Sequence, residues 1–242
     1  MNKSISAIWL GAILLAGCQS AQMPTQKGFG NIYGTVTARS HKAIVAKAEA
    51  VAAGKVSGQY ETLADGRMAY NATMVNYNEL DEIYVGVIGA TSKRGTIHDL
   101  RADDNGFTSR SVALATGDIL HITNGTQRPL TFFLAGTTSD TFDELPVLGP
   151  GASGNIAVTS SGDFELAADE DERISALILS RPGMAVKRIS SGSDYLFENL
   201  KPGNYRMVFW FWRLGEKQRQ ITVIANKSVK LSETLAVDTL VR

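Results

Sequence analysis

The stretch Gly117-Asp-Ile-Leu-His-Ile-Thr-Asn124 predicts a short β-strand enclosed by turn residues. Its centre alternates, because apolar Leu120 and Ile122 are separated by polar His121. Residues that alternate in this way point to opposite faces of a strand, so one face is buried and the other is polar. Gly117-Asp118 begins the stretch and Asn124-Gly125 ends it, both with residues typical of turns. We therefore expect a strand over 119–123.

Similar short runs follow one another at intervals of about 8–12 residues, which is typical of a β-sandwich. The expected strands are 83–88, 119–123, 131–134, 155–158, 163–167, 174–179, 205–212, 219–224 and 228–231. Asp103-Asp-Asn-Gly106 predicts a tight turn, because Asn-Gly tolerates positive φ angles. The alanine-rich segment 41–55 is the exception and predicts one amphipathic helix, either covering a sheet edge or lying on a membrane surface. The sequence thus predicts an all-β fold with one short helix.

The overall composition excludes some classes of function. Lysine and arginine together number 24, as do aspartate and glutamate, so the chain carries no net charge and nothing favours binding to nucleic acid. The single cysteine excludes an intramolecular disulfide. No G-x-S-x-G, H-E-x-x-H or P-loop motif is present, and no cofactor is indicated, so we do not expect an enzyme.

The N-terminus points to the compartment. Behind Lys3 an apolar run of about eleven residues leads into Leu15-Ala-Gly-Cys18, and this length is too short to span a bilayer. The pattern resembles the lipobox of bacterial lipoproteins, which implies removal of residues 1–17 and lipidation of Cys18. Gln19 in place of aspartate resembles the default sorting to the outer membrane. We therefore expect an outer-membrane lipoprotein facing the periplasm, with residues 18–30 as lipid anchor and tether.

Two further stretches resemble known modules. Phe107-Thr-Ser-Arg-Ser-Val112 followed by Gly117–Asn124 resembles the centre of a cupredoxin, and Phe197-Glu-Asn-Leu-Lys-Pro-Gly-Asn-Tyr205 resembles a carboxypeptidase-regulatory-like module. The combination is similar to plastocyanin-like periplasmic proteins often labelled methylamine-utilisation proteins. It implies a cupredoxin-like Greek-key sandwich over 31–180 and a small transthyretin-like β module over 181–242. The early strand 34–37 could complete the second module.

The chain departs from this family at the copper ligands. A type-1 copper site takes two imidazoles, a thiolate and usually a thioether. Leu130 stands where the first histidine would be, and Ala168, Asp171 and Ile174 stand at the cysteine, histidine and methionine positions. Three of these side chains have no donor atom, so we do not expect copper binding.

Two other groups of residues are candidate sites. Asp169, Glu170, Asp171 and Glu172 form the densest acidic cluster, which is either a weak cation site, since Ca²⁺ prefers carboxylate oxygens, or a solvated loop. Phe209-Trp-Phe-Trp212 places Trp210 and Trp212 on one face of a strand. These tryptophans either form an exposed surface for a sugar or protein partner, or pack between the two modules.

The sequence therefore favours a non-catalytic protein that binds an unidentified periplasmic or envelope partner on a copper-free scaffold. The alternatives are binding of a cell-envelope glycan through Trp210 and Trp212, or of a metal ion at 168–172.

Overall fold

The computed structural model describes residues 24–40, 60–62, 68–70, 77–90 and 95–236. These residues form strands and a single short 3₁₀ helix, η2 (Tyr77–Glu79), which confirms the predicted all-β class. No helix in the described part of the chain is long and apolar enough to cross a membrane. The signal segment 1–17, Cys18 and the helix predicted at 41–55 lie outside the described residues.

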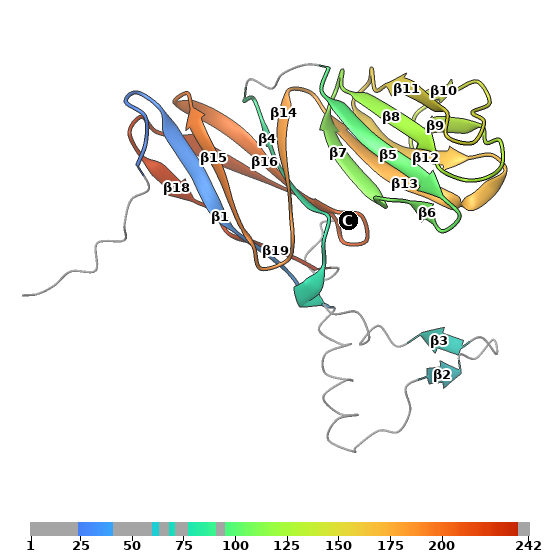
Figure 1. Cartoon of the computed structure of the whole chain (residues 1–242). Helices are drawn as coiled ribbons and strands as arrows, with labels where there is room; N and C mark the ends of the chain where they lie inside the picture. The colour runs from blue at the N-terminus through green and yellow to red at the C-terminus, as the bar shows by residue number, and fades with distance from the viewer. Residues whose placement is uncertain (1–23, 41–59, 63–67, 71–76, 91–94, 237–242) are drawn as a thin grey trace, which may run out of the picture.

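Two β-sandwiches stand side by side in Figure 1, one on the left and one on the right. The left one, here called the composite sandwich, joins strands from both ends of the chain. One of its sheets is β15 (Asp194–Leu200), β1 (Gly30–Ala38) and β18 (Ser228–Lys230), with β19 (Glu233–Leu235) also paired to β1. The other is β14 (Met184–Ile189), β4 (Ile83–Ile88), β16 (Gly203–Phe211) and β17 (Gly215–Val223). Apolar residues of both sheets, among them Ile32, Val85 and Phe209, form one core cluster.

The right one, here called the inserted sandwich, is built from one continuous stretch of chain between β4 and β14. Its first sheet is β10 (Phe142–Glu144), β9 (Phe132–Gly136), β12 (Gly162–Ala168), β13 (Asp171–Arg181) and β7 (Ser111–Ala115). Its second sheet is β11 (Ser153–Ala157), β8 (Ile119–Asn124), β5 (Ile97–Asp103) and β6 (Gly106–Phe107). Leu120 and Ile122 of β8 are fully buried in its core, as their alternation predicted. A separate hairpin pairs β2 (Tyr60–Thr62) with β3 (Met68–Tyr70).

The expected division of the chain at residue 180 does not match the strand pairing. β1 and β4 lie within 31–180, yet β1 pairs with β15, β18 and β19, and β4 pairs with β14 and β16. The C-terminal stretch therefore shares both of its sheets with strands from the first half of the chain. The C-terminal stretch needs these additional strands because about sixty residues alone bury too little apolar surface to form a stable sandwich.

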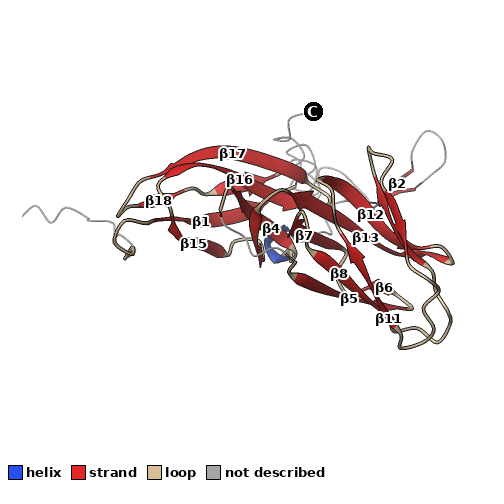
Figure 2. Cartoon of the chain, turned by 90° about the horizontal axis from the view of Figure 1, so that it is seen from above, coloured by secondary structure: helices blue, strands red, loops and turns tan. Residues whose placement is uncertain are grey.

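The two sandwiches meet through a small apolar cluster, here called the junction cluster: Tyr84, Ala113, Leu179, Met184, Val208 and Trp210. Figure 2 shows β7 beside β4 at this boundary. The Tyr84 hydroxyl donates a hydrogen bond to the backbone carbonyl of Ser111 in β7. Burial and the nearby Glu82 charge raise the pKa of Tyr84 to about 12, so the phenol keeps its proton and remains a donor. Arg181 of the inserted sandwich also forms an ion pair with Glu216 of the composite sandwich.

Candidate functional site

Trp210 is unavailable as a binding surface, which corrects one of the two sequence alternatives. The side chain belongs to the junction cluster and only 7% of its surface is exposed. Its ring centroid lies 5.6 Å from that of Tyr84. The neighbouring Phe209 and Phe211 point into the core of the composite sandwich, so both faces of β16 are covered here.

Trp212 has a different position from the one predicted. β16 ends at Phe211, so Trp212 begins the turn to β17 and is half-buried. The Arg213 guanidinium lies 4.3 Å from the centroid of its indole, which is a cation–π contact. Trp210 and Trp212 therefore do not form one platform.

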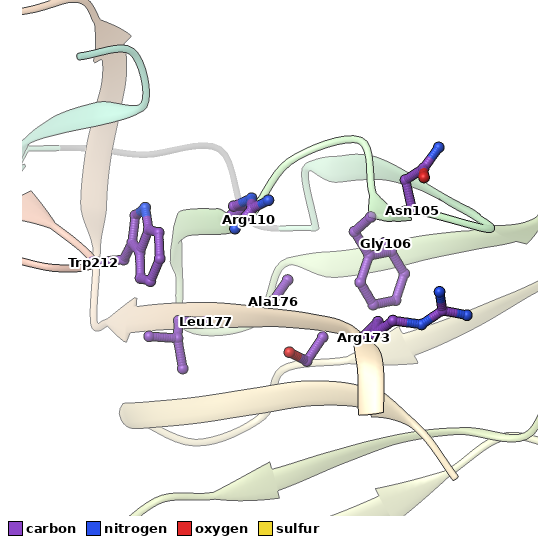
Figure 3. Close-up of a pocket in the computed structure, with 9 residues that line it drawn as sticks. Asn105, Gly106, Arg110, Arg173, Ala176, Leu177 and Trp212 are labelled. Carbon is purple, nitrogen blue, oxygen red and sulfur yellow. The ribbon is translucent and has the colours of Figure 1, made fainter. Parts of the chain in front are cut away.

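A groove at the junction of the sandwiches contains Trp212. It consists of two adjoining cavities of about 910 and 580 Å³, which share Arg110, Leu177 and Trp212 as lining residues. The larger cavity is lined mainly by the composite sandwich, with Tyr77, Leu80, Asp81, Glu82, Phe211, Arg213 and Leu214. The smaller one lies over the inserted sandwich and is lined by Asn105, Gly106, Phe107, Arg173, Ser175 and Ala176. Figure 3 shows this trough between the 105–110 segment and β13, with Trp212 at one end and Arg173 near the other.

Glu82 fixes the wall of the groove that carries Arg110. Its backbone has a φ of 62°, a left-handed conformation that costs free energy in a residue other than glycine. Its carboxylate accepts hydrogen bonds from the Arg110 backbone N–H at 3.2 Å and from the Ser111 hydroxyl at 3.4 Å. It also pairs with Arg188, which in turn bonds to Ser109. Through these contacts Glu82 and Arg188 hold the loop before β7 against the composite sandwich.

The cations of the groove differ in their engagement. Arg173 pairs with Asp171, and its hydrogen bonds hold the pKa of that carboxyl well below its usual range. Arg110 is exposed, and among the described residues no hydrogen bond or ion pair engages its guanidinium. Glu82 pairs with Arg188, whereas Asp81 accepts only from the neutral Ser190 hydroxyl and keeps its charge. The groove therefore offers a ligand two positive charges, Arg110 and Arg213, and one negative charge, Asp81.

Two of the four residues in the acidic cluster, Glu170 and Asp171, form contacts within the protein. Slight desolvation of the exposed Glu170 would raise its pKa, but hydrogen bonds that it accepts from the Thr131 backbone N–H and hydroxyl outweigh this and lower the pKa. Asp171 is held by Arg173 and also by Arg128. Asp169 and Glu172 are exposed and the four side chains do not converge. In the part of the chain that the structure describes, no group of three or more histidine, cysteine, aspartate or glutamate residues could hold a metal ion.

The positions that the cupredoxin resemblance assigns to copper ligands do not fit copper. Leu130, Ala168 and Ile174 are all buried in the core of the inserted sandwich. Asp171, at the fourth position, is the carboxylate already paired with two arginines. Apolar side chains fill the place where donor atoms would be needed.

The groove is the feature that sequence reasoning missed. Arg110 and Trp212 come from different sandwiches, and no local pattern indicates that they share a cavity. The one local signal is Trp212-Arg213 itself, an aromatic and a cation at the end of an apolar strand.

Comparison with known proteins gives fold resemblances only. No family model and no curated protein sequence matches the chain. A Cu(I) form of an amicyanin variant is 10% identical and covers 40% of this chain and 98% of its own, with a TM-score of 0.32. The purple cupredoxin from Nitrosopumilus maritimus is 11% identical over 34% of this chain and 98% of its own (TM-score 0.31). The copper-containing nitrite reductase from Thermus scotoductus is 14% identical over 39% of this chain and 24% of its own (TM-score 0.33). Values at this level do not assign the chain to a family or a function.

Proposed function

We propose that this protein is a non-catalytic binding module that takes its ligand in the groove between the two sandwiches. In this proposal it is a lipoprotein anchored through Cys18 in the outer membrane, faces the periplasm, and uses a cupredoxin-like scaffold without copper. The observation that carries the proposal is that Trp212 and Arg110 line the same cavity, and that no described residue forms a side-chain hydrogen bond or ion pair with Arg110. An apolar cleft with a few convergent polar groups is the usual form of a ligand site.

The chemistry of the groove favours binding over catalysis. Among its described lining residues there is no histidine or cysteine to act as base or nucleophile. Its acidic residues already serve as structural acceptors. The groups open to a ligand are an aromatic surface, two cations and the Asp81 carboxylate, which suit recognition of a ligand.

Hydrogen exchange of the full chain carrying Cys18→Ser tests the location of the site. We expect a periplasmic extract or soluble cell-wall fragments to protect residues 105–110, 173–177 and 211–214. Trp212→Ala should abolish that protection, whereas Phe142→Ser should not, because Phe142 is 58% exposed on β10 and lines neither cavity. Protection confined to other surfaces, or none in the groove, would refute the proposal.

The anchor has its own test. The wild-type chain should fractionate with the outer membrane, with residue 18 carrying lipid by mass spectrometry. Cys18→Ser should release the protein into the soluble fraction, and a wild-type protein found soluble and unmodified would contradict the anchoring.

Glycan binding remains a second candidate function, with one tryptophan instead of two available to contact the sugar. Trp210 is buried, so only Trp212 could stack against a sugar ring. Protection of the groove by purified cell-wall glycan, with no protection by extract from which glycan has been removed, would favour this candidate.

A further inference from the structure

One end of the composite sandwich holds the segment with which the described chain begins. The Gly28 N–H donates to the side-chain carbonyl of Asn226 at 2.8 Å, and the Asn226 N–H donates to the Phe29 carbonyl at 2.7 Å. Gly30 lies so close to the same turn that a Cβ on it would come within 2.6 Å of the Ile224 carbonyl oxygen. The N-terminal segment is therefore fixed to the turn between β17 and β18.

This end of the molecule, here called the basal end, consists of residues 24–30, 198–204 and 222–228. β15 meets β1 there at the Leu200–Gly30 pair, and β16 meets β17 at the Gly203–Val223 pair. β16 runs from Gly203 at the basal end to Phe211, which lines the groove. Figure 1 shows the blue N-terminal segment at the left end of the composite sandwich, away from the inserted sandwich. The basal end and the groove thus lie at opposite ends of β16.

The basal end has a local excess of positive charge and an exposed apolar side chain. Its three segments contain three lysines, Lys27, Lys201 and Lys227, and one acid, Glu198. All four side chains are exposed, and no described residue forms a hydrogen bond or ion pair with the lysine side chains. Ile224, in the same turn as Lys227, is 49% exposed. Because the whole chain carries no net charge, this excess is a property of the basal end.

The proposed lipid anchor would keep the basal end near a membrane. Five residues separate Cys18 from Pro24, where the described chain begins. An extended chain covers at most about 3.6 Å per residue, so Pro24 lies within roughly 20 Å of the lipidated residue. Anionic lipids attract basic residues that come within a Debye length of the membrane surface. The basal end can therefore reach the lipid headgroups, whereas the groove lies about 25 Å further along β16.

We infer that the basal end is a membrane-contacting surface, which binds anionic lipid headgroups through Lys27, Lys201 and Lys227 and places Ile224 at the bilayer interface. This inference rests on the anchoring at Cys18 in the proposed function and adds a second, non-covalent contact to it. Burial of an apolar side chain and attraction to anionic lipids both strengthen such interfacial binding. This orientation directs the groove away from the bilayer, where a ligand can enter it.

Quenching of a fluorophore by lipids tests the contact in the lipidated full chain. The only cysteine of the chain is residue 18, so Ile224→Cys provides a single free thiol for a bimane label once residue 18 is lipidated. Val147→Cys is the matched control, because Val147 is 62% exposed and belongs to the inserted sandwich. The vesicles contain phosphatidylethanolamine, phosphatidylglycerol and a lipid with a nitroxide on its headgroup. We expect at least threefold more quenching at residue 224 than at residue 147, and equal quenching at both, or none at residue 224, would overturn the inference.

The role of charge is tested with the same label at residue 224. Vesicles of phosphatidylcholine, which carry no net charge, should give less than half of the quenching seen with the anionic vesicles. The combined variant Lys27→Gln, Lys201→Gln and Lys227→Gln should lose a similar share in the anionic vesicles. Replacement of the same three lysines by arginine is the matched control and should preserve the quenching, because the charge is kept. Equal quenching in the glutamine and arginine variants would overturn the contact with anionic headgroups.

Mass spectrometry of residue 18 separates this inference from the proposed function. A protein that carries lipid at residue 18 but shows no quenching at residue 224 would keep the proposed anchoring and overturn this inference alone. A residue 18 without lipid would overturn the anchoring and this inference together.

Discussion

Replacing Trp210 by alanine should reveal how strongly the two sandwiches stabilise each other. A buried aromatic side chain covers about 150–250 Å², and burial contributes about 25 cal/mol per Å². With only 7% of Trp210 exposed, nearly all of that area is lost to the variant. Area alone thus gives roughly 4–6 kcal/mol as an upper estimate, and measured Trp→Ala changes in protein cores cost about 3–5 kcal/mol. We expect Trp210→Ala to lower the free energy of unfolding by about 4 kcal/mol.

Urea denaturation of the full chain with Cys18→Ser, followed by circular dichroism, measures this loss. A change of that size corresponds to a fall in Tm of roughly 8–16 °C for a protein of this length. Trp212→Ala is the matched control and should cost less, with roughly 2–3 kcal/mol as an upper estimate from area, because Trp212 is only half-buried. If Trp210→Ala does not fold, Trp210→Phe should fold with a loss of roughly 1–2 kcal/mol. A Trp210 variant no less stable than the Trp212 variant would refute the role of the junction cluster.

Three further changes probe other parts of the structure by the same denaturation assay. Gly34→Ala should destabilise by about 1–3 kcal/mol, since its Cβ would lie 1.9 Å from a backbone carbonyl oxygen of the segment after β18. Gly149→Ala is the control and should cost little, because its Cβ would have no atom within 4 Å. Equal losses of stability in the two variants would contradict the close approach at Gly34. Tyr84→Phe removes the hydrogen bond to β7 and should cost about 1 kcal/mol, and an unchanged stability would show that this bond contributes nothing. Glu233 is partly buried, which opposes ionisation, but hydrogen bonds and the Lys217 charge outweigh this and lower its pKa below the ordinary value of 4.5. The contribution of Glu233 to the free energy of unfolding is therefore present above about pH 4.5 and is lost as the pH falls through the lower pKa of the folded state. Below pH 4.5 the free energy of unfolding of Glu233→Gln should therefore depend less on pH than that of the wild type. The same pH dependence in both proteins would contradict the coupling.

The strands with a clear local pattern could be predicted from the sequence. β4 spans Ile83–Ile88 as expected, and β8 and β13 contain the predicted 119–123 and 174–179. These strands are bounded by turn residues, and their apolar positions alternate or are continuous, so local sequence determines them. β14 and β15 were missed because each carries several exposed polar residues and packs only part of its surface.

Strand partners and the groove could not be predicted in the same way. β1 pairs with β15 across most of the chain, and nothing within either segment names its partner. The position of Arg110 beside Trp212 depends on how the two sandwiches pack, which is a sum of many contacts in the junction cluster and around Glu82. The burial of Trp210 follows from the same packing, so its two alternative roles could be separated only in three dimensions.

Because the strands of one sandwich are inserted in sequence between strands of the other, the two sandwiches can fold only in a certain order as the chain is synthesised. Residues 97–181 contain every strand of the inserted sandwich, so this unit can form before the C-terminal stretch has left the ribosome. β1 emerges early but finds β15 only after residue 194, and β18 and β19 later still. Pairings separated by so much chain form slowly, because loop closure precedes the contacts that reward it. We therefore expect the edges of the N-terminal strand to stay unpaired until the C-terminal stretch is made, and the composite sandwich to close last, beside a neighbour that has already folded.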